Sequence, residues 1–356
     1  MKKMNVALIG FGRSGKNIHS QYFLSADNDK VAVLYVVDAM EGRRKMAEKA
    51  FGCTVLSDYR DLFDKKDIDL VVNASYSHMH YEITKDLLSH GFNVLVEKPF
   101  SRTYYECCDL ILTAKKHNVI VSAFHQSLYT PAYKKIKEII QSGRLGRILQ
   151  INLKYSGFAR RWDWQTLQNR CGGGVYNTGP HPIGQALDFL GWDERTEVRF
   201  SDLDLALTSG DADDYAKIIL SCPGKPVVDI EINSADAYAG DYVFKIYGTR
   251  GTLLSDNAEY RLKTVDLESA PPRPVIEQSL CDPDLEPIYC REDLPVKEET
   301  GAVTGTSFDV AVKEYYDMLY GAVMQGKKLA VTPEMAAMVI KIIESTHVSN
   351  PLPVTR

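Results

Sequence analysis

One glycine motif constrains the fold of this 356-residue chain more than any other feature. It lies between an apolar run, Val6–Ile9, and a helical pattern over Gly12–Leu24. The motif comprises Gly10, Phe11, Gly12, Arg13, Ser14 and Gly15. In the spacing G-x-G-x-x-G, glycines allow a tight turn, a close approach of the backbone to a pyrophosphate and close packing of helix on strand. The motif therefore predicts a dinucleotide-binding unit, and a glycine turn that binds no ligand is the alternative.

The first 124 residues alternate between short apolar runs and amphipathic stretches. The apolar runs are Val6–Ile9, Val31–Val37, Leu70–Ala74, Asn93–Val96 and Ile120–Phe124. The helical patterns are Gly12–Leu24, Gly42–Phe51, His80–His90 and Thr103–Lys116. Buried strands that alternate with helices are typical of a doubly wound parallel sheet. We therefore expect an α/β protein in which residues 1–124 form an N-terminal Rossmann dinucleotide-binding domain.

From about Ile148 onward, apolar and polar residues alternate over longer runs. These runs are Ile148–Tyr155, Thr196–Asp204, Asp214–Leu220, Val227–Asn233 and Tyr242–Tyr247. The pattern predicts that residues 125–330 form a second, C-terminal α/β domain with a large open, mainly antiparallel sheet.

The last part of the chain combines an irregular stretch with two helices. Residues 263–306 are rich in proline and acidic residues and show no periodicity, which predicts a long surface excursion. Phe308–Met324 and Pro333–Thr346 have helical patterns, and the second begins with a proline suited to a first helical turn. We expect this final helix, at about 333–346, to pack back on the first domain.

The composition argues against several partners and locations. The net charge of −5 disfavours a nucleic-acid partner, because such proteins usually carry a basic excess. Lys2 and Lys3 precede only the short run Val6–Ile9, so neither a signal peptide nor a membrane span is expected. The seven cysteines show no C-x-x-C spacing, so we expect no metal site, no disulfide framework and a cytoplasmic location.

The choice of dinucleotide depends on Asp38, which ends the second predicted strand. A carboxylate about 20 residues beyond the motif can accept hydrogen bonds from ribose hydroxyls and repels a 2′-phosphate. NAD is therefore expected in preference to NADP. Arg43 and Arg44 follow closely; they could approach a 2′-phosphate, or they could form the solvated start of a helix.

A candidate catalytic lysine follows the fourth predicted strand. Glu97, Lys98 and Pro99 come directly after the run Asn93–Val96, at the carboxyl edge of the parallel sheet, where ligands bind in such folds. A lysine there could polarise a substrate hydroxyl and contact the nicotinamide ribose. The alternative is a surface ion pair between Lys98 and Glu97.

Six stretches of sequence match one known family. They are A-L-I-G-F-G-R-S-G at the start, S-D-Y-R-D-L-F at Ser57–Phe63, H-Y-E-I-T-K-D-L-L-S-H-G-F-N-V-L-V-E-K-P at His80–Pro99, G-R-L-G-R-I at Gly143–Ile148, G-G-G-V-Y-N-T-G-P-H-P-I at Gly172–Ile183 and the final V-T-P-E-M-A. Along nearly all its length the chain thus resembles the glucose–fructose oxidoreductase, inositol dehydrogenase and rhizopine catabolism (Gfo/Idh/MocA) family of oxidoreductases.

The resemblance implies an NAD-dependent dehydrogenase that moves hydride between nicotinamide and a hydroxyl carbon of a sugar or polyol, such as an inositol, an aldose or a glycoside. It implies that His181 is the acid/base toward the reacting hydroxyl, assisted by Lys98, and that the bond before Pro99 is cis. It also implies that the second domain binds substrate and that its sheet mediates a homodimer or homotetramer. The implied cofactor contacts, besides the glycine motif, are Asp38, Arg43, Ser75, Tyr76, His80, Glu97 and Lys98.

Several candidate substrate-binding positions depart from the family pattern. Asn177 stands where most members have an aspartate, so it cannot stabilise an imidazolium by charge, although it can hydrogen-bond to substrate. Ser127 and Leu128 stand where arginines often follow the sixth strand. His125, just before them, could face the substrate or be a packed core residue.

A further substrate-binding candidate is the segment that contains Trp162 and Trp164. Two tryptophans suit stacking on a sugar ring, and polar neighbours such as Arg161 could bind its hydroxyls. The alternative is that both tryptophans fill the junction between the domains.

Three other functions remain open from the sequence. The enzyme could oxidise a glycoside transiently with retained NAD, which loosens the glycosidic bond. It could instead reduce an imine or enal-type substrate with NADPH. The third alternative is a non-catalytic NAD-binding ligand sensor. Lys98 and His181 weigh against it, but Asn177, in place of the aspartate common in the family, keeps it open.

Overall fold

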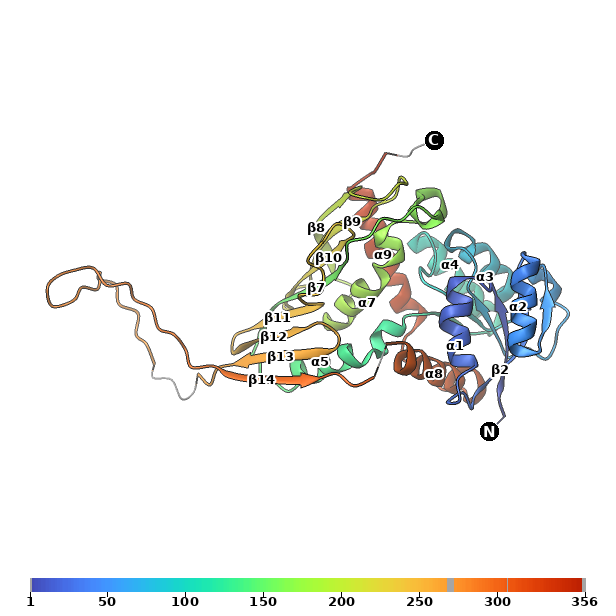
Figure 1. The fold of residues 1–356 in the computed structure, drawn as a ribbon, viewed down its shortest axis with the longest axis horizontal. Helices are drawn as coiled ribbons and strands as arrows, with labels where there is room; N and C mark the ends of the chain where they lie inside the picture. Colours follow the sequence, from blue (N-terminus) through green and yellow to red (C-terminus); the bar gives the residue numbers. More distant parts are fainter. Residues whose placement is uncertain (1, 268–271, 306, 354–356) are drawn as a thin grey trace.

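The computed structural model describes residues 2–267, 272–305 and 307–353, which form two sheets (Figure 1). The first sheet is parallel throughout, with strand order β3-β2-β1-β4-β5-β6. Its strands are β1 (Met4–Ile9), β2 (Val31–Val37), β3 (Thr54–Leu56), β4 (Leu70–Asn73), β5 (Val94–Val96) and β6 (Val121–Ala123). This order confirms the predicted doubly wound sheet. Strand β3 was not predicted, because a partly exposed strand of three residues leaves no pattern.

Helices cover both faces of the parallel sheet. They are the π-helical turn η1 (Gly15–His19), α1 (Ser20–Phe23), α2 (Glu41–Phe51), α3 (His80–Ser89) and α4 (Tyr104–His117), with short 3₁₀ turns η2 (Tyr59–Leu62) and η3 (Ser77–Met79). The first helical stretch begins at Arg13, one residue after the expected Gly12, and becomes π-helical at Gly15. The sequence specifies both ends of helix α4. Thr103 and Glu106 form a reciprocal capping box at its start, and Asn118 ends the helix with a left-handed backbone conformation.

The chain returns to the parallel sheet after completing the second one. Helix α8 (Val312–Gln325), preceded by η7 (Ser307–Ala311), packs with α1 on one face of the parallel sheet. Helix α9 (Pro333–Ser349) packs with α4 on the other face and also contacts the second sheet. Helices from the end of the chain therefore complete the core of the first domain.

The second sheet has eight strands in the order β14-β13-β12-β11-β7-β10-β9-β8. They are β7 (Ile148–Ser156), β8 (Glu197–Asp204), β9 (Tyr215–Ser221), β10 (Val227–Asn233), β11 (Phe244–Gly248), β12 (Gly251–Ser255), β13 (Glu259–Thr264) and β14 (Lys297–Ala302). All pairs are antiparallel except β7 and β10, which run parallel. This confirms the expected mainly antiparallel sheet.

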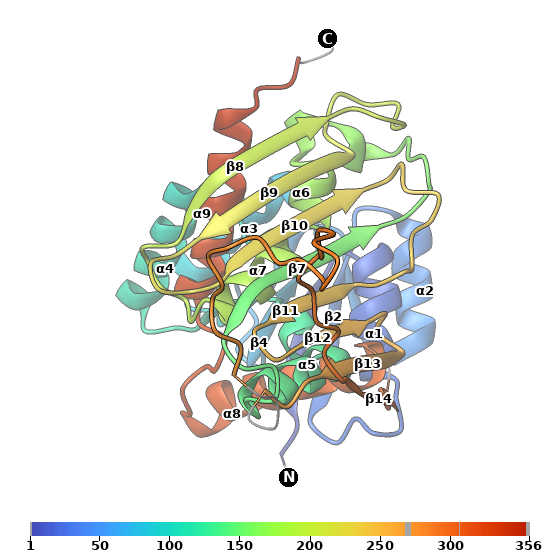
Figure 2. The ribbon, with the colours of Figure 1, turned by 90° about the vertical axis from the view of Figure 1, so that its left-hand side faces the viewer.

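One face of the second sheet is covered and the other is open. Helices α5 (Pro131–Gln141), α7 (Pro180–Phe189) and α9 lie behind the sheet in Figure 2, and its near face carries no helix. The strands alternate accordingly: Ile230 and Ile232 are buried, whereas Asp229 and Glu231 are partly exposed. Short helices connect the layers: η4 (Gln126–Tyr129), η5 (Trp164–Thr166), η6 (Gln168–Arg170) and α6 (Gly174–Asn177).

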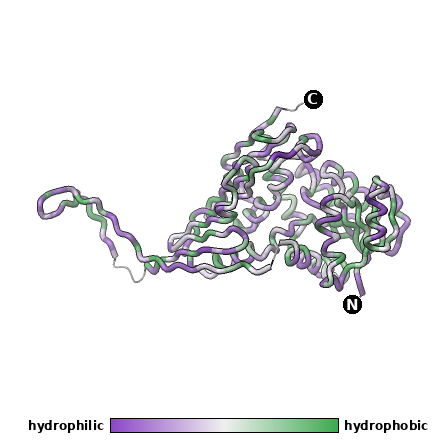
Figure 3. Tube along the Cα trace, viewed as in Figure 1, coloured by the Kyte–Doolittle hydropathy of each residue, from purple (hydrophilic) through white to green (hydrophobic). Residues whose placement is uncertain are grey.

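The expected surface excursion is an arm that extends far from the rest of the molecule between β13 and β14 (Figure 1). Its two limbs are joined by Arg273, which donates to both carboxylate oxygens of Glu292 at 2.8 and 2.9 Å. Hydrophobic and hydrophilic residues alternate along it in Figure 3. Val275 and Tyr289 are 92% and 87% exposed, so the arm has no core of its own.

The excursion is shorter than the sequence indicated, because Lys297–Ala302 pairs with β13 as an edge strand. This strand is polar on both faces, so no apolar alternation signals it. None of the described helices is long and apolar enough to cross a membrane.

Candidate active site

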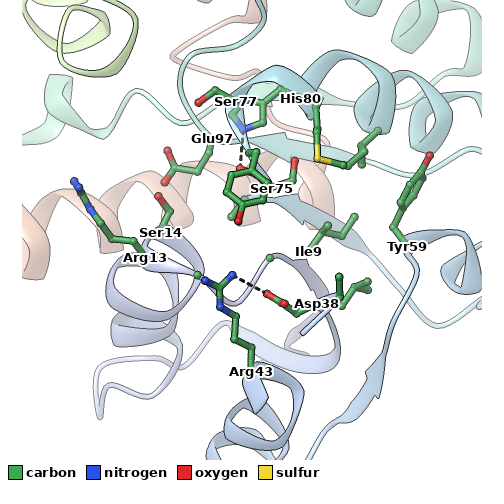
Figure 4. Close-up of a pocket in the computed structure, with 18 of the residues that line it drawn as sticks. Ile9, Arg13, Ser14, Asp38, Arg43, Tyr59, Ser75, Ser77, His80 and Glu97 are labelled. Atoms are coloured by element: carbon green, nitrogen blue, oxygen red, sulfur yellow. Dashed lines mark hydrogen bonds and ion pairs between the residues drawn. The ribbon is translucent and has the colours of Figure 1, made fainter. Parts of the chain in front are cut away.

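A cavity of about 580 Å³ lies at the carboxyl ends of β1, β4 and β5, where the strand order of the parallel sheet reverses (Figure 4). This is the position at which open α/β sheets bind ligands. The glycine motif forms one wall. Gly10 has φ +88°, and a Cβ on it would overlap the carbonyl oxygen of Ala74; a Cβ on Gly15 would overlap the carbonyl oxygen of Gly10. Side chains are therefore excluded at both positions, because the glycine turn packs directly against neighbouring backbone.

Asp38 lies at one end of this cavity, as Figure 4 shows. One carboxylate oxygen accepts the backbone N–H of Phe11 at 2.8 Å, and the other accepts that of Met40 at 2.9 Å. Arg43 also lines the cavity, with its guanidinium 3.6 Å from Asp38. Arg44 turns away and donates to the carbonyl oxygens of Asp38 and Ala39. Of the two arginines considered from the sequence, only Arg43 reaches the cavity.

The floor of the cavity contains a buried charge network around Glu97. His19 Nε2 lies 3.2 Å from Glu97 Oε1, and Tyr316 Oη lies 2.7 Å from His19 Nδ1. The second oxygen of Glu97 accepts the backbone N–H of Lys98 at 3.0 Å. Burial alone would raise the pKa of Glu97, but the hydrogen bond and charge of His19 and the charge of Lys98 lower it to about 2. The sequence analysis missed His19, because a lone histidine in a helical pattern carries no signal of its role.

Lys98 contacts Asn177 rather than Glu97 through its side chain. Its Nζ donates to the Asn177 carbonyl oxygen at 2.8 Å and lies 3.4 Å from Asn177 Oδ1. Gln165 Nε2 donates to the same Oδ1 at 2.8 Å. Burial lowers the pKa of Lys98; Glu97 opposes this, and Arg13 and Arg161 add to it. The surface ion pair considered from the sequence is therefore not formed, and the fold brings Lys98 and Asn177 together from different domains.

Two histidines, His125 and His181, are held neutral by burial. Burial and the nearby Lys98 lower the pKa of His181 to about 3. Burial, with Lys98 opposing the effect of Glu97, lowers that of His125 to about 4. The Nδ1 atom of each ring is buried and has no hydrogen-bond partner among the described residues. Neither histidine is among the residues that line the cavity.

The turn after β4 is held by His80, on α3. His80 Nδ1 lies 2.7 Å from the Pro99 carbonyl oxygen, and Nε2 lies 3.3 Å from that of Ser75. Ser75 Oγ donates to Asn73 Oδ1 at 2.7 Å. The Lys98–Pro99 bond is cis. His80 thus connects two segments of the cavity wall, and Figure 4 shows its contact with Ser75.

The glycine-rich turn before α6 holds Asn177 in place. A Cβ on Gly172 would lie 2.5 Å from the Gln165 carbonyl oxygen, and a Cβ on Gly173, with φ +105°, would overlap the Asp213 carboxylate. Asp213 is buried and accepts the backbone N–H of Val175 at 2.7 Å. Glycines at these positions therefore let the turn pack tightly beside Gln165.

The two tryptophans occupy different environments. Trp164 lines the cavity and makes an edge-on contact with Tyr76, with ring centroids 5.0 Å apart. Trp162 is 78% exposed and does not line this cavity. Arg161 donates to Asp163 at 2.6 Å and also to Gln165. The tryptophans do not jointly fill a buried junction.

A second cavity of about 440 Å³ adjoins the first. The two share Gln165 and Asn177. Because β7 and β10 run parallel, their carboxyl ends meet here, and Lys154 and Asn233 line the cavity from these two strands. The sequence analysis missed this pair, because each is one polar position in an alternating strand. Among the described residues, no cluster of three or more His, Cys, Asp or Glu side chains could hold a metal ion.

The comparisons with known proteins agree with this arrangement in both domains. Residues 4–125 match the oxidoreductase family profile described as an NAD-binding Rossmann fold. Residues 133–254 match the GFO/IDH/MocA C-terminal domain. The chain belongs to the Gfo/Idh/MocA family of oxidoreductases. The family predicted from the sequence is thereby confirmed, as is its NAD-binding Rossmann fold.

Individual Gfo/Idh/MocA relatives are distant. An inositol 2-dehydrogenase of Saccharopolyspora erythraea is 27% identical over 254 residues, which cover 70% of this chain and 72% of the relative. A 2,7-anhydro-N-acetylneuraminate hydratase of Mediterraneibacter gnavus is 25% identical over 264 residues, covering 72% and 68%. The solved structure of a levoglucosan dehydrogenase with NADH and levoglucosan superposes with a TM-score of 0.77 at 20% identity, covering 98% and 97% of the two chains.

Proposed function

We propose that the protein is an NAD-dependent dehydrogenase that oxidises a hydroxyl carbon of a sugar or polyol. One observation carries the proposal: Lys98, which lines the first cavity, donates at 2.8 Å to Asn177, which lies on the wall between the first cavity and the second. A substrate in the second cavity would lie beside the part of the first that the nicotinamide would occupy. The names of two relatives, an inositol 2-dehydrogenase and a levoglucosan dehydrogenase, support a substrate of this class.

The residues around the first cavity fit NAD. The backbone of the glycine motif would bind the pyrophosphate, and Asp38 would accept hydrogen bonds from the adenosine ribose. The Asp38 carboxylate would repel a 2′-phosphate, and Arg43 at 3.6 Å offsets that repulsion only in part. We therefore propose NAD as the preferred cofactor. When bound, NAD would accept the hydride of the substrate carbon.

Lys98 and His181 would have different roles toward the reacting hydroxyl. His181, neutral because of its lowered pKa, would donate its one N–H to the reacting oxygen and stabilise it as its proton leaves. Lys98, whose pKa is lowered by burial, would take up the proton in its amine form while its own hydrogens remain donated to Asn177. Asn177 would orient Lys98 and the substrate without supplying charge.

The experiment that tests this function measures reduction of NAD and of NADP separately, with a panel of inositols, aldoses, sugar acids and glycosides. The proposal predicts NADH formation with one polyol class and much slower use of NADP. Saturable NAD binding without any turnover across the panel would contradict it.

A second candidate is transient oxidation of a glycoside with retained NAD. It is favoured by the relative named as a hydratase, because a hydratase catalyses no net oxidation. Released aglycone with no accumulation of free NADH would distinguish it from the dehydrogenase.

We also propose a cytoplasmic homodimer or homotetramer. All seven cysteines are unpaired, which fits a reducing compartment. The exposed apolar residues of the arm, and the face of the second sheet that carries no helix, support a contact with a second copy.

A further inference from the structure

A third cavity of about 480 Å³ opens at the surface beside the first. The two cavities share Tyr76, Asp163 and Trp164. The outer cavity, as we call this third one, also contains Trp162, His78 and Arg170. Neither Lys98 nor Asn177 lines it, so it lies outside the catalytic positions.

The outer cavity combines aromatic rings with polar groups. Trp162 is 78% exposed and Tyr76 is 43% exposed, which is unusual for such large side chains. The ring of His78 stacks on Tyr76 with centroids 6.0 Å apart. Arg170 Nη1 lies 2.6 Å from His78 Nε2, and burial, reinforced by the charge of Arg170, lowers the pKa of His78. A neutral His78 therefore accepts from Arg170 and fixes its guanidinium at the cavity wall.

The backbone that carries Trp162 is held firmly. The carbonyl oxygen of its neighbour Arg161 accepts hydrogen bonds from Ser209 N at 3.2 Å and from Thr208 Oγ1 at 3.0 Å. On the facing loop, a Cβ on Gly210 would overlap the Thr166 carbonyl oxygen, so the two loops are in direct backbone contact. Trp162 is thus presented to solvent from a fixed position, which reduces the entropy lost when a ligand binds.

These features match the needs of a carbohydrate ring. Its C–H face stacks on an aromatic ring, and its hydroxyls accept from an arginine or donate to a carboxylate such as Asp163. The outer cavity meets the second cavity, where we place the substrate, at Thr166, and it meets the first cavity at Trp164. One glycoside can therefore extend from the second cavity into the outer cavity.

We propose that the outer cavity binds the second ring of a glycoside substrate, with Trp162 as its stacking surface. This inference rests on the proposed function, because it assumes that the first ring is a sugar oxidised beside Lys98. It narrows the substrate class from free monosaccharides to disaccharides and longer glycosides.

The test compares maltose, cellobiose and lactose with glucose and galactose, in the wild type and in Trp162→Ala. Binding to the NAD-loaded protein is measured by calorimetry, and turnover by NADH formation. We expect at least one disaccharide to bind at least tenfold more tightly than its monosaccharide, and Trp162→Ala to abolish this gain while leaving monosaccharide binding and NAD binding unchanged. Tyr105→Ala, which removes an aromatic ring that is 77% exposed on α4, is the matched control and should keep the gain.

Two results would overturn the inference: no disaccharide binds more tightly than its monosaccharide, or Trp162→Ala weakens both equally. The calorimetry separates this failure from failure of the proposed function. A disaccharide that binds through Trp162 but yields no NADH supports the outer site and contradicts only the dehydrogenase reaction.

Discussion

At the scale of single residues, burial and neighbouring charges determine the protonation states of the titratable side chains in the site. Glu97 is charged although it is buried, because His19 and Lys98 lie beside it. His125 is buried and His181 half-buried, the Nδ1 of neither has a hydrogen-bond partner among the described residues, and both are neutral at ordinary pH. Burial also lowers the pKa of Lys98 from 10.5. We therefore propose that Lys98 carries the proton chemistry of the site.

This assignment predicts the pH dependence of substrate oxidation. Only unprotonated Lys98 can accept the hydroxyl proton, so kcat/KM should rise with pH and level off above a pKa below 10.5. His181 stays neutral down to about pH 3, so no inflection near 6.5 is expected. A profile measured between roughly pH 5 and 10 checks both, because it covers the usual histidine pKa and extends toward that of lysine. An inflection near 6.5 that disappears in His181→Asn would show that the histidine titrates instead.

A second residue-scale prediction concerns the cofactor. Asp38→Ala removes the charge that repels a 2′-phosphate and leaves Arg43 beside the open position. The ratio of kcat/KM for NADP over NAD should rise by about tenfold or more, a change of ~1.4 kcal/mol. In Asp38→Ala combined with Arg43→Ala most of the gain in NADP use should vanish. An unchanged ratio in the single variant would mean that Asp38 does not face the ribose.

At the scale of elements, glycine turns position the reactive side chains. The turn at Gly172 and Gly173 packs against Gln165 and Asp213, and this contact places Asn177 beside Lys98. The sequence showed that these glycines lead into a helix. It could not show that Asp213 lies against them, because that contact forms only when the second sheet brings the start of β9 to this turn.

Gly173→Ala should therefore destabilise the protein, because its φ is +105° and a Cβ would overlap Asp213. We expect a loss of about 2 kcal/mol or more in the free energy of unfolding, and a lower Tm. Gly42→Ala is the control: an added Cβ there has no neighbour within 4 Å, and Gly42 lies in α2. That variant should be neutral or slightly stabilising. Equal Tm values for the two variants would contradict the packing described for the turn.

At the scale of the whole molecule, the sequence pattern predicted some features of the fold and missed others. Apolar runs and the glycine motif were sufficient to predict the parallel sheet and its ligand-binding edge. The arm was predicted only as an irregular excursion, and β14 was missed because its residues are polar on both faces. The outer cavity was also beyond pattern analysis, since Trp162 and His78 are far apart in sequence and meet around one surface hollow.

The arm gives a prediction at this scale. Replacing 267–296 with a short glycine–serine linker removes exposed apolar side chains such as Val275 and Tyr289 without touching a strand. We expect the molar mass of the assembly, measured by light scattering, to fall to that of a smaller oligomer or a monomer. An unchanged mass would show that the arm takes no part in assembly. Arg273→Ala, which removes the ion pair between the two limbs, serves as a milder comparison.

The most direct test of the central claim is substrate-dependent NADH formation by Lys98→Met, compared with the wild type on whichever sugar or polyol the panel identifies. Methionine keeps the length of the side chain but can neither accept a proton nor donate to Asn177. We predict that kcat falls by about 100-fold or more while the Kd for NAD changes by less than about threefold. Near-normal turnover in this variant would contradict the account.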